Sequence, residues 1–204
     1  MNEIRKETRA FEFEVRAEQN EEHGTHLTGT PIVFNQQTDL GWYSEVIDSH
    51  ALDDTDLRDV RFLVNHNIDM IPLARSRNNN ANSTMQMTVT EEGMQIRVDL
   101  DTENNADART LYSAVKRGDI SGMSFMFMVD SDQWDGIDTE HPTRTILRIS
   151  KVFEVSAVTW PAYEQTNIEA ASSALESAKE VLESARRSQK LEELRASVRA
   201  LLED

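Results

Sequence analysis

The chain has 204 residues, of which 38% are hydrophobic and 28% charged, a composition typical of one globular core with an appended element. It contains no cysteine, which excludes disulfides, thiolate metal ligands and cysteine catalysis, and it lacks the roughly 20 consecutive apolar residues that a membrane span needs. The formal net charge of −16 repels phosphate backbones, so we expect binding to neither nucleic acid nor membrane.

The N-terminal region is predicted to be β structure. Residues 8–17 alternate apolar and charged side chains, which is the period of a half-buried strand. Residues 27–34 are also strand-like, and Gly29 and Pro31 predict a bend or a sheet edge there. Because the first residues lack the apolar stretch of a signal peptide, we expect a cytoplasmic protein.

The next region contains a strand that ends in polar residues. Residues 40–47 predict a short strand or turn, and the acidic and small residues at 48–56 favour a short helix. An apolar run at 60–64 then ends at Asn65 and His66. A rigid strand that ends this way presents polar side chains at the rim of a sheet, where functional groups are often found.

A hairpin and a helix follow. Residues 84–101 form two alternating runs joined at 91–93, which predicts a β-hairpin. The next stretch predicts a helix of about four turns, with Thr102 or Asn104 as its N-cap and Gly118 at its end.

The last strands precede a change in composition. Residues 121–129 and 143–160 are strand-like and are separated by an acidic turn region at 130–142. From 168 to 204 the chain has no Gly or Pro, and apolar residues recur at helical spacing at Leu175, Ala178, Leu182, Ala185, Leu191, Leu194, Val198 and Leu201. This pattern predicts an amphipathic helical tail that packs on the domain, on another subunit or on a partner. The order of elements predicts a mainly β fold with α (α+β).

Three polar residues stand out in predicted β segments. Ser124 and Glu154 each lie in an otherwise apolar strand, and His66 ends one. A buried carboxylate needs a partner, and an imidazole from a neighbouring strand would be one. A serine acts as a nucleophile when a base accepts its proton and a third group orients that base. Singly, such a serine more often fills a small space and such a histidine is more often structural.

Other catalytic and metal motifs do not fit. The nucleophile elbow of α/β-hydrolases needs glycine where Met126 stands, and Glu103 occupies the glycine position of an aspartic-protease motif. His23 and His26 form an isolated pair without the spacing of a zinc site. We therefore expect neither a metal nor a cofactor.

The chain resembles the tailed-phage (caudovirus) prohead serine proteases in the blocks FLVNHN, PLARS, GDISGMSFMFMV and FEVSAVTWPAYEQT. The order and spacing of these blocks cover roughly residues 10–167. The resemblance implies a serine endopeptidase with a herpesvirus-assemblin-like β-barrel surrounded by helices. On this reading, residues 1–167 form the protease domain, and residues 168–204 are a tail for targeting, oligomerisation or autoprocessing.

The resemblance also assigns roles to individual residues. It implies that His66 is the general base, Ser124 the nucleophile and Glu154 the third member of the triad. Family members often have glycine where this chain has Ala74 and Met126; neither change removes a reacting group. Backbone amides near Ser124 would supply the oxyanion hole.

The implied substrates and partners are those of capsid assembly. They are the scaffold region of the major capsid protein, the protease itself and the portal, inside the immature capsid (prohead) in the host cytoplasm, with the protease as a homo-oligomer. Arg75 is expected either to position a water or oxyanion or to form a structural salt bridge. A non-catalytic capsid-assembly or scaffold-binding module with the same fold is the alternative function.

Overall fold

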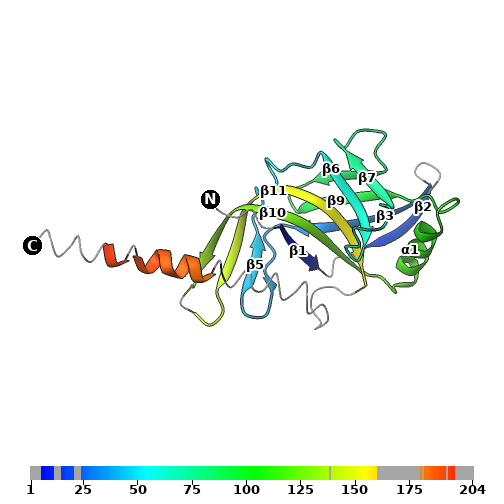
Figure 1. Ribbon diagram of the computed structural model, residues 1–204. Coiled ribbons are helices and arrows are strands. Elements are labelled where there is room, and N and C mark those ends of the chain that lie inside the picture. The colour runs from blue at the N-terminus through cyan, green and yellow to red at the C-terminus, as the bar shows by residue number, and fades with distance from the viewer. Residues whose placement is uncertain are drawn as a thin grey trace, which may run out of the picture.

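The computed structural model describes residues 6–11, 15–20, 24–137, 139–159, 180, 182–191 and 193–195. Its strands form two sheets (Figure 1). The seven-stranded sheet consists of β1 (Lys6–Phe11), β4 (Thr38–Asp39), β5 (Ser44–Ile47), β6 (Asp59–Val64), β7 (Ala74–Arg77), β10 (Gly122–Asp135) and β11 (Thr143–Val158). The four-stranded sheet consists of β2 (Arg16–Asn20), β3 (Gly24–Val33), β8 (Met85–Val89) and β9 (Gly93–Asp99).

Strand β11 is the centre of the larger sheet. The order runs β1-β10-β11-β5-β4, and β6 pairs with β11 further along the same strand and with β7 on its other side. The β10–β11 pair is antiparallel, whereas β11 pairs with β6 in parallel. Three strands that are distant in sequence therefore lie side by side. Ser124 lies on β10, Glu154 lies on β11, and His66 lies two residues after the end of β6.

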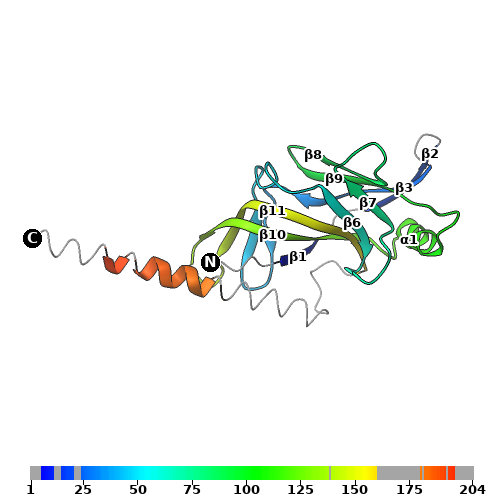
Figure 2. The ribbon, with the colours of Figure 1, turned by 45° about the horizontal axis from the view of Figure 1, so that its top comes forward.

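Figure 2 shows the strands of the two sheets from a second direction. Buried side chains from both sheets share one hydrophobic core. From the larger sheet, Phe62, Phe125 and Val155 are fully buried, and Leu27 and Met94 meet them from the smaller one. Because successive residues of a strand point to opposite faces, Ser124, Glu154 and Ser156 lie on the other face of the larger sheet. The core thus fixes the strands, and the polar residues occupy the face turned away from it.

One helix among the described residues packs on this core. Helix α1 (Ala106–Arg117) begins after Asn105, whose side chain accepts hydrogen bonds from two backbone amides, and it ends at Gly118 with φ 79°. Its buried side chains are Ala108, Leu111 and Val115. The predicted helix is confirmed, but its N-cap is neither Thr102 nor Asn104.

Three local predictions were wrong in detail. The single strand expected at 8–17 is two strands, β1 and β2, in different sheets. Residues 48–56 form hydrogen-bonded turns instead of a helix. Strand β10 continues to Asp135, well into the region expected to be a turn, because it stays paired with β11 through several register shifts.

The expected fold class is confirmed as mainly β with α. The assemblin-like barrel surrounded by helices stays a prediction, because the described pairings define two sheets. Gly29 and Pro31 lie at an irregularity within β3, since the β3–β9 register shifts between Gly29 and Ile32.

Part of the predicted tail is described, and it is helical. Residues 182–191 and 193–195 are helical (Figure 1). Leu182 is buried, and Leu191 and Leu194 are exposed. The remainder of the predicted segment 168–204 lies outside the described residues. In the described part of the chain, none of the helices has the length and apolar character to span a membrane.

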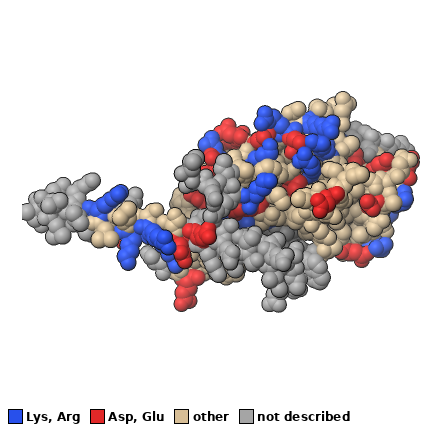
Figure 3. Space-filling view, in the orientation of Figure 1, with Lys and Arg blue, Asp and Glu red and all other residues tan. Residues whose placement is uncertain are grey.

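Basic side chains gather over β6 and β7 despite the acidic composition (Figure 3). Arg61 lies opposite Arg75 in the register, and Arg77 lies opposite Asp59. Asp59 accepts hydrogen bonds from both Arg61 and Arg75. The strand that leads to His66 is therefore bordered by cations held in ion pairs.

Candidate active site

The sheet brings the strands that carry Ser124 and Glu154 next to the strand that leads to His66. Ser124 on β10 lies opposite Ser156 on β11, and Ser156 lies opposite Leu63 on β6, three residues before His66. Glu154 lies two residues before Ser156 on the same strand, so both side chains share one face. The register thus supports the sequence expectation that these segments converge.

His66 is the partner that the buried carboxylate of Glu154 was predicted to need. His66 Nδ1 lies 2.5 Å from Glu154 Oε1, with the histidine side chain 23% exposed and the carboxylate 3% exposed. A carboxylate partner at Nδ1 favours the neutral tautomer with its hydrogen on that atom. The Nε2 atom then carries the lone pair that a general base needs.

The backbone at His66 has an unusual conformation. Asn65 and His66 both have positive φ, at 50° and 56°, in the left-handed region that non-glycine residues seldom adopt. Strand β11 and its end hold this turn: the Asn65 amide donates to the Ala157 carbonyl, and Asn65 Oδ1 accepts from the Thr159 amide. Such a conformation persists where surrounding contacts impose it, and it is common at functional sites.

Ser124 has a different partner from the one expected. Its side chain is fully buried, and its Oγ donates to the carbonyl oxygen of Arg9 on β1 at 2.7 Å. Within the described residues no hydrogen bond joins Ser124 to His66. A serine hydroxyl has one hydrogen to donate, so transfer of that hydrogen to His66 requires the bond to Arg9 to break first.

Ser156 is a further residue of the candidate site, one that its place in the sequence alone did not single out. Its Oγ donates to Glu154 Oε2 at 2.5 Å and accepts the backbone N–H of His66 at 3.1 Å. The available signal was its position two residues after the buried glutamate, on the same face of the same strand. Both oxygens of Glu154 therefore accept hydrogen bonds, one from the imidazole and one from this serine.

Buried ion pairs join β1 to β5 and β11 of the larger sheet. Arg9 donates to both oxygens of Glu45 at 2.6 and 2.8 Å, and Arg144 donates to both oxygens of Glu7 and to Asp132. Burial alone would raise the pKa of Glu7, but hydrogen bonds and charges from Arg144 and Arg9 outweigh it and lower the pKa to about 2. The strand whose carbonyl engages Ser124 is thus anchored by charge as well as by the β ladder.

Arg75 forms the structural salt bridge that was one of its two expected roles. Its Nε and Nη2 atoms donate to the two carboxylate oxygens of Asp59 at 2.6 and 2.8 Å. The hydrogen bond from Arg75 lowers the pKa of Asp59. Ala74, next to it, is buried opposite Phe62 in the β6–β7 pair.

A second serine–histidine contact lies elsewhere in the larger sheet. Ser44 Oγ is 2.9 Å from His141 Nε2, and Asp39 Oδ1 lies 3.6 Å from that same nitrogen. A triad needs the carboxylate on the opposite ring nitrogen, Nδ1, so that it can orient the base. His66 and Glu154 meet this requirement, whereas His141 and Asp39 do not.

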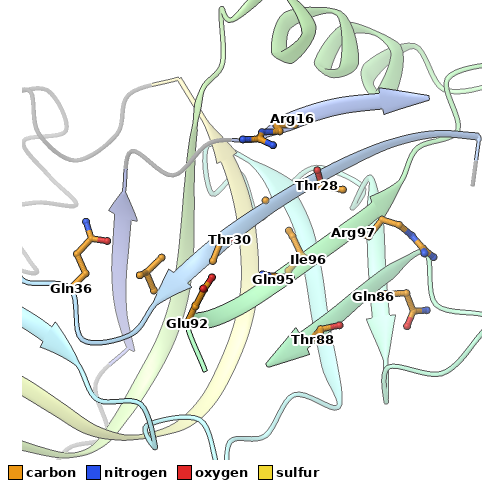
Figure 4. A pocket seen from close by; sticks show the side chains of 12 residues that line it. Arg16, Thr28, Thr30, Gln36, Gln86, Thr88, Glu92, Gln95, Ile96 and Arg97 are labelled. Atoms are coloured by element: carbon orange, nitrogen blue, oxygen red, sulfur yellow. The ribbon is translucent and has the colours of Figure 1, made fainter. Parts of the chain in front are cut away.

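One cleft lies on the smaller sheet, away from these residues. It has a volume of about 690 Å³ and is lined by polar side chains such as Thr28, Gln86, Thr88, Gln95 and Arg97 (Figure 4). None of the three predicted site residues lines it. Across the described ranges, no group of three or more His, Asp or Glu residues is arranged to hold a metal ion.

Comparison with known proteins gives a family match. The family model described as caudovirus prohead serine protease matches residues 11–181. Among solved structures, the bacteriophage T4 capsid assembly protease, gp21, aligns with a TM-score of 0.38 and 11% sequence identity, over 76% of this chain and 99% of that chain. No curated protein sequence matches the chain.

Proposed function

Because the chain belongs to the caudovirus prohead serine protease family, we propose that it is a capsid-maturation endopeptidase with Ser124 as nucleophile, His66 as general base and Glu154 as the group that orients the base. The observation that carries this proposal is the 2.5 Å contact between His66 Nδ1 and Glu154 Oε1 beside the strand that bears Ser124. It supplies a base whose ring is fixed by a buried carboxylate.

The mechanism follows from this arrangement. The Ser124 hydroxyl leaves the Arg9 carbonyl and donates to His66 Nε2, which takes the proton as Oγ attacks the substrate carbonyl. Glu154 stabilises the imidazolium, and backbone amides near Ser124 stabilise the oxyanion. The imidazolium then protonates the leaving amine, and water hydrolyses the acyl-enzyme with His66 again as base.

The proposed substrates come from the family resemblance. They are the scaffold region of the major capsid protein and the protease itself, cleaved inside the prohead in the host cytoplasm, and the portal is a proposed partner. The tail, residues 168–204, would target the protease, join subunits in a homo-oligomer or be removed by autoprocessing. Support for an interaction role is that Leu191 and Leu194 are half-exposed on its helix.

A second candidate is a non-catalytic assembly module with the same fold. The observation that favours it is the state of Ser124, whose hydroxyl is fully buried and bonded to Arg9 instead of to a histidine. In this alternative the chain binds the scaffold without cleaving it, and the Ser124 hydroxyl only stabilises the pairing of β1 with β10.

Labelling and cleavage test the two candidates together. Full-length protein is treated with a fluorophosphonate probe, which reacts with activated serines, and the labelled residue is mapped by mass spectrometry. In parallel, the protein is co-assembled with the capsid protein, and scaffold cleavage is followed by gel. Ser124→Ala is compared with Ser44→Ala, since Ser44 is also buried and contacts a histidine.

We expect the label on Ser124 and a loss of turnover by several orders of magnitude in Ser124→Ala, with Ser44→Ala close to wild type. Labelling of Ser44, or undiminished cleavage by Ser124→Ala, would overturn the assignment of the nucleophile. Intact scaffold and unlabelled protease in assembled proheads would favour the module.

A further inference from the structure

Ser156 contacts both His66 and Glu154, the two residues that would activate the nucleophile. Its hydroxyl donates its hydrogen to Glu154 Oε2 at 2.5 Å and accepts the backbone N–H of His66 at 3.1 Å. The residue is fully buried, so water does not replace either bond readily. One side chain therefore touches both the carboxylate and the main chain of the histidine.

We propose that Ser156 is a positioning residue that sets the orientation of His66 through Glu154 and through the histidine backbone. The inference rests on the proposed roles of Ser124, His66 and Glu154. Two bonds define the carboxylate plane: the bond from Ser156 fixes Oε2, and this leaves Oε1 facing His66 Nδ1. A carboxylate held by one bond could rotate about its last side-chain torsion, which is broad for glutamate.

The second bond of Ser156 acts on the histidine main chain. His66 follows Asn65 in a two-residue left-handed turn, and each such residue is unfavourable by roughly 1–3 kcal/mol unless its surroundings hold it. Strand β11 and its end supply these contacts at three places: the Ser156 hydroxyl, the Ala157 carbonyl and the Thr159 amide. Of these, the Ser156 bond ends on His66 itself, so its loss would let the ring shift relative to Ser124.

Ser156 is not placed to be the nucleophile. Its hydrogen is directed to a carboxylate, and its contact with His66 is to the backbone amide instead of to the ring. Ser124, its partner in the β10–β11 register, lies on the same face of the sheet with a backbone carbonyl as its acceptor. The two serines thus have separate roles: one would react, and the other would hold the groups that activate it.

The test compares Ser156→Ala with Ser150→Ala in the full-length chain. Ser150 lies on the same strand, and its hydroxyl donates to the Met128 carbonyl at 3.2 Å, away from the candidate site. Fluorophosphonate labelling of Ser124 is measured over a range of probe concentrations, which separates the maximal rate from the affinity for the probe. Melting temperatures establish that each variant is folded.

We expect the maximal labelling rate of Ser156→Ala to fall by about 100-fold, as a misplaced catalytic group does, with little change in affinity for the probe. Ser150→Ala should label like wild type. Ser156→Cys fills the same space with a weak hydrogen-bond donor and should resemble Ser156→Ala. Labelling at the wild-type rate by folded Ser156→Ala or Ser156→Cys overturns the proposal.

A second readout is independent of the nucleophile. The proton of a short imidazole–carboxylate hydrogen bond gives a low-field resonance in proton NMR spectra, assigned here by its loss in His66→Gln. This resonance should be present in wild type, Ser124→Ala and Ser150→Ala, and shifted or lost in Ser156→Ala. An unchanged resonance in Ser156→Ala contradicts the positioning role. If Ser124 proves unreactive in wild type, the proposed function fails, and this resonance still decides the role of Ser156.

Discussion

Glu154 is an acidic side chain in an apolar strand, and the structure gives each of its oxygens a hydrogen-bond donor. Oε1 faces His66 Nδ1, and Oε2 accepts from Ser156. With 3% of the side chain exposed, the carboxylate depends on these partners for its stability in the fold. A neutral amide of the same shape would keep the volume and lose the charge, which separates the electrostatic role of Glu154 from its packing.

Glu154→Gln should therefore fold and be a poor enzyme. The amide cannot stabilise the imidazolium, and if its NH₂ group faces Nδ1 it favours the wrong tautomer, so we expect kcat to fall by about 10⁴-fold with an altered pH profile. Scaffold cleavage measured across pH checks this, with Glu91→Gln in the exposed β8–β9 turn as the control. A Glu154→Gln enzyme with the rate and pH profile of wild type would remove Glu154 from the mechanism.

At the scale of elements, the β8–β9 hairpin depends on the absence of a side chain at its turn. Gly93 has φ +150°, and a Cβ atom added there would lie 2.0 Å from the Ile32 carbonyl oxygen of β3. Since that obstacle is backbone, it cannot move aside without disturbing the β3–β9 pairing. Gly41 also has positive φ, but nothing lies within 4 Å of the corresponding position.

The two glycines form a matched pair for a stability measurement. We expect Gly93→Ala to lower the free energy of unfolding by several kcal/mol, since it combines an unfavourable φ with a backbone clash. Gly41→Ala should lower it by about 1 kcal/mol, from the backbone conformation alone. Urea unfolding of both variants measures the two losses of unfolding free energy. Equal losses would show that the close contact between position 93 and the β3 backbone does not matter for stability.

Elements that are defined by local pattern were predictable from the sequence, and those defined by partners were not. The hairpin at 84–101 and the helix ending at Gly118 both appear as expected, because turn and cap residues act over a few positions. The split between β1 and β2 was missed, because alternation shows which face of a strand is buried and says nothing of which sheet it joins.

The candidate site was likewise predictable where it depends on local chemistry and not where it depends on strand pairing. The sequence predicted that Glu154 needs a partner and that His66 could be that partner, from the chemistry of a buried carboxylate. The bond from Ser124 to Arg9 could not be predicted, because it depends on the register of β1 against β10. Ser156 could have been noticed two positions after Glu154, but its bond to the His66 amide requires the left-handed turn.

At the scale of the whole molecule, a buried ionic network joins the first strand to the rest of the larger sheet. Glu7 and Arg9 of β1 meet Glu45 of β5 and Arg144 of β11. The pKa of Glu7 is about 2 in the folded chain, against an ordinary value of 4.5. A lowered pKa means that the carboxylate stabilises the fold above pH 4.5 and loses this contribution as the pH falls towards 2.

Glu7→Gln should therefore be less stable than wild type at neutral pH, and the difference should shrink between pH 4.5 and about 2. The shift corresponds to a contribution on the order of 3 kcal/mol. Urea unfolding at intervals across this range measures it, with Glu91→Gln as a control for the change in net charge. If the difference in stability stays constant through this pH range, Glu7 stabilises the fold by something other than its ionised carboxylate.

If Ser124 is the nucleophile, its hydrogen bond to the Arg9 carbonyl must break before the chain can cleave a substrate, and the free-energy cost of that step can be bounded. If activation requires only that the hydroxyl turn from one acceptor to another, the penalty is one hydrogen bond, about 1 kcal/mol, and the chain would be nearly active as folded. If activation requires β1 to separate from β10, the buried ion pairs of β1 break as well. Activation would then need an outside event, such as assembly of the shell, to supply the free energy. Because β1 (Lys6–Phe11) carries the carbonyl that binds Ser124, a protein or tag fused to the N-terminus would then change the activity.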